Sequence, residues 1–249
     1  MLVFVIPLQS RAASRDWSKV SRLCVRTLQS VCAQRDSQFR AILVCNEPPD
    51  GLPLLPELQV VSEKFSMPDA TTAERMADKW LKVKRGLIEV RRLAPAYVMI
   101  VDADDCVHRD LALWIRSQQS GHGWVLHSGY IWNRGSRWLL KQDRFEESCG
   151  TSSIVWCEKA DLPRSLDEPN ERFPILRFGH TAIVPGCASL GKPLRQLPFR
   201  GAVYNVATGE NDSGIDLRRW SSRRLKLQRF FRYRPLTRWH RATFGLYEV

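Results

Sequence analysis

Uninterrupted apolar runs are the clearest pattern in the N-terminal part of the chain. Leu2–Pro7, Phe39–Cys45 and Tyr97–Val101 consist almost entirely of β-branched and other large apolar residues. A short run without alternating polar positions is typical of a strand buried on both faces, as in the interior of a parallel sheet. A shorter run, Leu58–Val61, predicts one further strand.

Helical spacing separates these runs. Apolar residues recur every three or four positions from Val20 to Val31, and the segment from Thr72 to Leu93 is helical in composition. A strand, a helix and a second strand with short connections form a βαβ unit, whose parallel crossover is right-handed. The sequence therefore predicts an α/β fold.

The run that ends at Val101 is followed at once by three carboxylates, Asp102, Asp104 and Asp105. Functional groups of open α/β sheets gather at the carboxyl ends of the strands. Carboxylates placed this close repel one another unless a cation lies among them. A divalent metal that holds substrate phosphates would supply that charge. The alternative is a solvated acidic turn.

These segments, in this order, resemble the nucleotide-sugar glycosyltransferases of fold type A. The matching pieces cover roughly residues 1–110 and are Val3–Pro7, Ile42–Glu47, the helix with Asp78-Lys79 and Lys84–Leu87, and Ile100–Asp105. Gly150–Val155 and Phe178–Ile183 are similar to the acceptor-side half. The resemblance implies a metal-dependent hexosyl transfer from a nucleoside-diphosphate sugar to the hydroxyl of a glycan, lipid or small molecule.

The resemblance also implies the fold class and a division of the chain. We expect one α/β domain of this type, with a mostly parallel central sheet flanked by helices, and a basic C-terminal extension. The glycosyltransferase domain would span residues 1–215, with a nucleotide-binding half (1–110) and an acceptor half (111–215). Residues 216–249 would form the extension, which is basic and aromatic. A length of 249 residues suits one such domain.

Residues that would bind the nucleotide sugar are carried over from the resemblance. The loop after the first strand and the end of the second long strand would hold base and ribose, and helix cations would neutralise the diphosphate. The predicted residues are Pro7, Gln9, Arg11, Asn46, Glu47, Lys79, Lys84, Arg85, Asp102, Ala103, Gly150 and Thr151. For each lysine the alternative is a solvated helix face, and for Gly150-Thr151 it is a polar turn.

The metal would be Mn²⁺ or Mg²⁺, which prefer oxygen ligands and need only one or two carboxylates when phosphates and water complete the shell. Asp104 is the best single candidate ligand, and Asp102, Asp105 and His180 are further ones. Asp102 could bind ribose instead. A lone histidine is more often structural.

The general base is a carboxylate near the acceptor hydroxyl in an inverting transferase. Glu146, Glu147 and Glu210 are the candidates, although a solvated surface carboxylate is the commoner role for each. The paired acidic motif of many inverting members matches Glu146-Glu147 only approximately. The sequence therefore leaves the stereochemical outcome open.

The charge of the chain is +12, with a sequence pI of about 9.7. Ten basic residues lie between Arg218 and Arg241, with five aromatic residues among them. Such a segment can lie on an anionic membrane, can bind nucleic acid, or can pack on the catalytic domain. The lack of a recognisable nucleic-acid fold argues against the second.

Seven scattered cysteines without metal-site spacing indicate reduced thiols in the cytosol. The sequence predicts neither a signal peptide nor a transmembrane helix. We expect a protein free in the cytoplasm or peripheral on the inner face of the membrane. Two rival functions remain. A nucleotidyltransferase would use the same strand end but usually has a glycine-rich loop after the first strand. An inactive binding module would dock through its basic tail.

Overall fold

The computed structural model describes residues 1–65, 71–118, 121–208 and 232–247. In the first half the elements are β1 (Leu2–Pro7), α1 (Trp17–Cys32), β2 (Phe39–Cys45), β3 (Leu58–Ser62), α2 (Thr72–Val90), β4 (Ala96–Ile100), β5 (Cys106–Val107) and α3 (Leu111–Ser117). The second half contains β6 (Gly123–Val125), β7 (Ser128–Asn133), β8 (Trp138–Asp143), β9 (Ser153–Cys157), α4 (Pro174–Arg177), α5 (Ile183–Ser189), β10 (Leu194–Gln196), β11 (Ala202–Val206), β12 (Tyr233–Pro235) and α7 (Arg238–Phe244). Short 3₁₀ turns cover Phe145–Glu147, Lys159–Asp161 and Asn170–Arg172.

The main sheet has seven strands in the order β10-β6-β9-β4-β1-β2-β3. β3, β2, β1 and β4 are parallel neighbours, and together with α1 and α2 they form the predicted βαβ arrangement. β9 runs antiparallel to both β4 and β6. The sheet is therefore mixed, whereas the sequence predicted a mostly parallel one, because β9 enters between two strands that run the other way.

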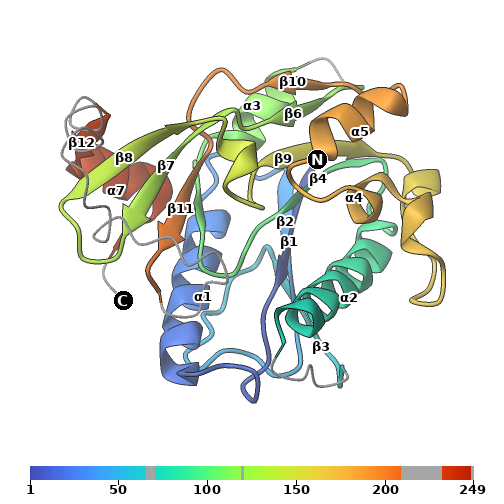
Figure 1. The fold of residues 1–249 in the computed structure, drawn as a ribbon, viewed down its shortest axis with the longest axis horizontal. Coiled ribbons are helices and arrows are strands. Elements are labelled where there is room, and N and C mark those ends of the chain that lie inside the picture. Colours follow the sequence, from blue (N-terminus) through green and yellow to red (C-terminus); the bar gives the residue numbers. More distant parts are fainter. Residues whose placement is uncertain (66–70, 119–120, 209–231, 248–249) are drawn as a thin grey trace.

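Burial of β1 on both faces explains its uninterrupted apolar sequence. Leu2, Phe4 and Ile6 pack in the hydrophobic cluster on the α1 side, while Val3 and Val5 pack in the cluster on the α2 side. Figure 1 shows α1 and α2 on opposite sides of these central strands. This sandwich fixes where the carboxyl ends of β1 and β4 lie relative to α2.

A glycine brings α2 unusually close to the sheet. A Cβ atom at Gly86 would lie 2.5 Å from Cγ1 of Val5 and 3.2 Å from Cγ2 of Val44. Real Cβ contacts are not this short, so the helix backbone rests directly on β1 and β2. Thr71 caps the other end of the helix, where its side chain accepts a hydrogen bond from the backbone N–H of Glu74.

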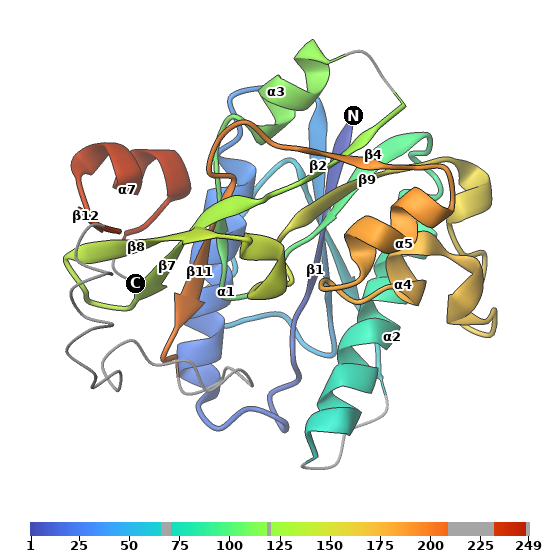
Figure 2. The ribbon, with the colours of Figure 1, turned by 45° about the horizontal axis from the view of Figure 1, so that its top comes forward.

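A second sheet, in the order β12-β8-β7-β11-β5, lies beside the first (Figures 1 and 2). Its strands pair antiparallel, except for the parallel pair β7 and β11. Phe244 and Leu246, at the end of α7 and just beyond it, pack with Tyr130 and Trp132 on one face of this sheet. The other face contributes Ile131, Leu140 and other residues to the cluster that contains α1, so the core continues between the two sheets.

The described part of the predicted C-terminal extension, residues 232–247, packs on the second sheet, where Tyr233 pairs with Leu140 and Pro235 with Trp138. The boundary predicted at residue 215, and most of the basic aromatic stretch, lie outside the described residues. Within the described residues, no helix combines the length and apolar character needed to cross a bilayer. All seven cysteines are free thiols.

Candidate functional site

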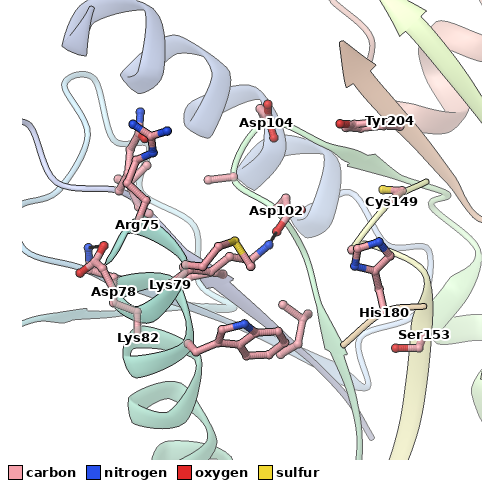
Figure 3. Close-up of a pocket in the computed structure, with 18 of the residues that line it drawn as sticks. Arg75, Asp78, Lys79, Lys82, Asp102, Asp104, Cys149, Ser153, His180 and Tyr204 are labelled. Atoms are coloured by element: carbon pink, nitrogen blue, oxygen red, sulfur yellow. Dashed lines mark hydrogen bonds and ion pairs between the residues drawn. The ribbon is translucent and has the colours of Figure 1, made fainter. Parts of the chain in front are cut away.

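A cavity of about 610 Å³ opens at the carboxyl ends of β1 and β4. Its walls come from the loops after these two strands, Val20 and Leu23 of α1, the first half of α2, the segment 147–153, the segment around α4 and α5, and Tyr204 of β11. Figure 3 shows Lys79 extending from α2 toward Asp102, with His180, Cys149 and Ser153 on the opposite side of the cavity. Carboxyl ends of strands are where open α/β sheets bind ligands.

Asp102 and Lys79 form the central ion pair of the cavity. Asp102 follows β4, and its backbone N–H donates to Oγ1 of Thr151 over 2.9 Å. Nζ of Lys79 lies 2.5 Å from Oδ1 of Asp102, as the dashed line in Figure 3 marks. Burial alone would lower the pKa of Lys79, but the charge of Asp102 and its hydrogen bond outweigh burial and raise it. Lys79 is therefore a cation at neutral pH.

Asp104 lines the same cavity, where burial and a neighbouring negative charge disfavour its ionised form. Burial and the negative charge of Asp102 raise the pKa of Asp104 to about 6. The buried guanidinium of Arg26, on α1, opposes this rise, and its Nη2 donates to the backbone carbonyl of Asp104 over 3.1 Å. The guanidinium also lies 5.3 Å from the ring centroid of Trp132. A cation placed near both carboxylates would relieve their repulsion.

Asp105, the third carboxylate of the cluster, points away from the cavity. It is fully buried and accepts hydrogen bonds from Oγ1 of Thr151 (2.6 Å), Sγ of Cys149 (3.1 Å) and the backbone N–H of Asn205 (3.1 Å). Burial, followed by the charges of Asp104 and Asp102, raises its pKa well above the ordinary value. Asp105 thus links the acidic turn to the 149–151 loop and to β11.

Gly150 lets that loop approach the ion pair. A Cβ at this position would lie 3.0 Å from Oδ2 of Asp102 and 3.5 Å from Nζ of Lys79. Gly150 lines the cavity, and Thr151 beside it is buried and holds Asp102 and Asp105 in place. Two predicted residues therefore meet the acidic turn in space, one facing the cavity and one behind it.

One face of α2 presents a polar stripe to the cavity, made by Arg75, Asp78, Lys79 and Lys82. Their spacing of three and four residues places them on one side of a helix. Nζ of Lys82 is fully buried, 2.7 Å from Oδ2 of Asp78, and burial lowers its pKa. Within the described residues, Oδ1 of Asp78 is buried and has no hydrogen-bond partner.

Lys84 and Arg85, both predicted to bind diphosphate, lie on other sides of α2. Nζ of Lys84 donates to the backbone carbonyls of Leu166, over 2.7 Å, and Glu168. Arg85 pairs with carboxylates outside the cavity, at 2.7 Å from both Glu63 and Glu89. The structure assigns both cations partners within the protein and places neither in the cavity wall.

Of the predicted residues in the loops after β1 and β2, only some line the cavity. Pro7 and Gln9 line the cavity, as does Ala103 after β4. Arg11 forms an exposed ion pair with Asp50 at 2.8 Å, and its backbone N–H donates to Glu47. Asn46 donates to the backbone carbonyl of Phe65 over 3.1 Å. Arg11, Asn46 and Glu47 are not part of the cavity wall.

Two candidate bases, Glu146 and Glu147, lie in the 3₁₀ turn at residues 145–147, and their side chains point in different directions. Glu147 lines the cavity and pairs with Arg144. Glu146 faces Nδ1 of His127 at 3.1 Å and is not part of the cavity wall. Glu210 lies outside the described residues.

His180, a predicted metal ligand, also lines the cavity. Burial and the nearby charge of Lys79 lower its pKa, so the imidazole is neutral at pH 7. Among the residues described, no three histidine, cysteine or acidic side chains lie close enough to form a complete metal site. Asp102 and Asp104 fit a metal that takes its remaining ligands from phosphate and water.

The charged cavity residues that the sequence analysis did not assign to the site are Arg75, Asp78 and Lys82, and Tyr204 was also not assigned. The helical spacing of the first three with Lys79 was a signal that could have found them. Tyr204 lies in β11, a short strand of the second sheet, and no sequence signal connects it to the acidic turn.

The chain matches no protein-family model. No curated protein matches it. Among solved structures, it is similar to the 2-C-methyl-D-erythritol 4-phosphate cytidylyltransferase of Francisella tularensis, with a TM-score of 0.39 and 11% sequence identity. That comparison covers 82% of this chain and 89% of the other. A likeness this low carries no argument about activity, so the function is inferred from the cavity itself.

Proposed function

We propose that the cavity binds a nucleoside-diphosphate sugar with Mn²⁺ or Mg²⁺ and that the protein transfers the sugar to an acceptor hydroxyl. The observation that carries this proposal is the opposition of charges. Asp102 and Asp104 face the cavity from the end of β4, and the ammonium group of Lys79, in the polar stripe of α2, reaches Asp102 from the other side. A metal–diphosphate group presents both signs of charge and matches this arrangement.

Each side chain has a role that follows from its position. Asp102 and Asp104 would hold the metal, which when bound stabilises the negative charge of the departing nucleoside diphosphate. Lys79 and Arg75 would bind the diphosphate oxygens as hydrogen-bond donors. One carboxylate oxygen of Asp102 contacts the ammonium group of Lys79. Lys79 would therefore have to move away from this oxygen when a metal binds.

Glu147 is the candidate general base. Its carboxylate would accept the proton of the acceptor hydroxyl as that oxygen attacks the anomeric carbon and the bond to the diphosphate breaks. Glu147 is preferred over Glu146 because it lines the cavity, whereas Glu146 is engaged with His127.

Nucleotidyl transfer is the alternative reaction for the same strand end. An enzyme of that kind would attack the α-phosphate of a nucleoside triphosphate and release pyrophosphate. The loop Leu8–Ser14 after β1 contains no glycine. The backbone of such a loop is less able to wrap closely around a triphosphate. This feature favours glycosyl transfer.

A substrate panel tests the proposal. UDP-, GDP-, CDP- and dTDP-sugars with Mn²⁺ should raise the melting temperature and release nucleoside diphosphate slowly, because a ligand that binds only the native state stabilises it. Asp104→Asn should remove the Mn²⁺-dependent part of both effects, while the exposed control Asp167→Asn should retain them. Pyrophosphate release from a nucleoside triphosphate and a sugar 1-phosphate would instead identify a nucleotidyltransferase. No response to any nucleotide would refute both reactions.

A further inference from the structure

The cavity has two chemically different sides. On the α1 side of the sheet its walls include Leu8, Val20 and Tyr204, which belong to the cluster around α1. On the α2 side they include Ile175 and Ile183, which belong to the cluster around α2. The acidic turn lies between these two sides, at the edge of the sheet.

Helix α2 changes character around its circumference at this point. Successive residues of a helix are rotated by about 100°. Arg75, Asp78, Lys79 and Lys82 therefore fall within a sector of about 100°, and Met76 and Trp80 fall in the sector next to it. All of these residues line the cavity. The polar stripe thus has an apolar stripe beside it, on the side where α4 and α5 pack.

Apolar side chains from four elements enclose a compartment beside that apolar stripe. Its walls are Met76, Trp80, Ile100, Ile175, Phe178 and Ile183. Trp80, Ile100 and Phe178 are only partly buried, so part of each side chain faces the cavity. Lys79, Asp102, Ser153 and His180 are polar residues that line the same cavity. Figure 3 shows Ser153 and His180 across from the labelled residues of α2.

The position of Phe178 is built into the backbone of α5. A Cβ at Gly186 would lie 2.4 Å from the ring of Phe178, so the ring rests directly on the helix backbone. Ile175 and Ile183 behind it are 6% and 3% exposed. The compartment wall is therefore continuous with the core, which holds its shape, and is not a loose surface patch.

We propose that this compartment binds the acceptor, and that the acceptor carries an aryl or alkyl group next to the hydroxyl that receives the sugar. The term acceptor rests on the proposed function. A diphosphate would lose its hydration against these walls without gaining partners, whereas an apolar group gains by leaving water. An apolar group seated here places a neighbouring hydroxyl beside the Lys79–Asp102 pair, where the donor sugar would end.

The test uses two probes that differ only in the apolar group: phenyl β-D-glucopyranoside and methyl β-D-glucopyranoside. Calorimetric titration of the full chain, without nucleotide or metal, should show binding of the phenyl glucoside at least tenfold tighter than the methyl glucoside. Equal affinities, or no binding of either probe because another part of the chain covers the compartment, would overturn the inference.

Variants locate the binding. Phe178→Ala should weaken phenyl glucoside binding about tenfold. The matched control Phe199→Ala, a partly buried ring that packs against His108 at 4.8 Å, should not. Met76→Gln keeps the length of the side chain at a residue that is 37% exposed, so this variant should fold. It therefore tests the compartment even if Phe178→Ala unfolds. It should weaken binding of the phenyl glucoside about threefold. Unchanged affinity in Met76→Gln would contradict the assignment.

Failure of this inference is separable from failure of the proposed function. Nucleoside diphosphates with Mn²⁺ should stabilise Met76→Gln as much as the unaltered protein, because Met76 lies outside the polar stripe. Nucleotide binding without selective binding of the phenyl probe would remove the acceptor assignment and leave the donor site. The reverse result would leave an apolar ligand site and remove the glycosyltransferase proposal.

Discussion

Asp104→Asn should make the metal-free protein more stable at pH 7, although it removes a predicted metal ligand. Burial and the charge of Asp102 raise the pKa of Asp104 from its ordinary 3.8 to about 6. At about 1.4 kcal/mol per pH unit, this difference corresponds to roughly 3 kcal/mol of destabilisation in the ionised native state. The side chain of Asp104 is only partly buried, and solvent screens its charge. We therefore expect Asp104→Asn to raise the free energy of unfolding by about 1–2 kcal/mol.

The pH dependence gives the sign of the effect. Below pH 3.8 the carboxyl group is neutral in both the folded and the unfolded state, so the variant and the unaltered protein should be equally stable. As the pH rises toward 6 and above, the native carboxyl group ionises at a cost that the amide avoids. The advantage of Asn should therefore grow between pH 4 and pH 6 and then stay constant.

Urea unfolding in the presence of a chelator measures this difference, and thermal melts should show a rise of about 3–6 °C at pH 7. Added Mn²⁺ should reverse the order, because only the unaltered protein binds it with both carboxylates. A lower stability of Asp104→Asn at pH 7, or a gain that is equally large at pH 4, would refute the electrostatic reasoning.

Three further substitutions test neighbouring contacts. Lys79→Gln should weaken binding of nucleoside diphosphate about tenfold. Without nucleotide the same variant should bind Mn²⁺ more tightly, since Asp102 loses the competing ammonium group. Calorimetry measures both affinities, and Lys159→Gln is the exposed control. Gly150→Ala should reduce sugar transfer at least tenfold with little change in melting temperature, because its Cβ would meet Asp102 at 3.0 Å; full turnover would contradict this. Lys84→Met should lower the free energy of unfolding by about 1–3 kcal/mol, measured in urea, by leaving two carbonyls without their donor, while nucleotide affinity stays unchanged.

The parallel core of the fold was predictable because its strands carry a strong local signal. β1, β2 and β4 are buried on both faces, so their apolar runs appear directly in the sequence. β6 and β10 have three residues each, which is too short for a pattern to emerge. The antiparallel entry of β9 and the second sheet depend on pairings between distant segments that no local pattern records.

The position of the candidate site at the acidic turn after β4 was predictable from the sequence, but the direction of each side chain was not. Asp102, Asp104 and Asp105 look alike in sequence, and only the packing of Thr151 and Asn205 shows that Asp105 faces inward. The helix cations show the same limit. A residue five positions after Lys79 is rotated by about 140° around the helix axis, so Lys84 leaves the cavity face. A residue three positions after Lys79, Lys82, stays on it.

The close contact between Gly86 and Val5 affects the position of Lys79, and through it the ion pair with Asp102. Lys79 lies two helical turns, about 10 Å, before Gly86 on the same rigid helix. A methyl group at Gly86 would push the helix away from Val5 by close to 1 Å, because 2.5 Å is far inside ordinary contact. Lys79 would then withdraw from Asp102, and the carboxylate would be left available to a metal. A steric substitution about 10 Å from Lys79 would therefore alter the proposed binding of a metal at Asp102.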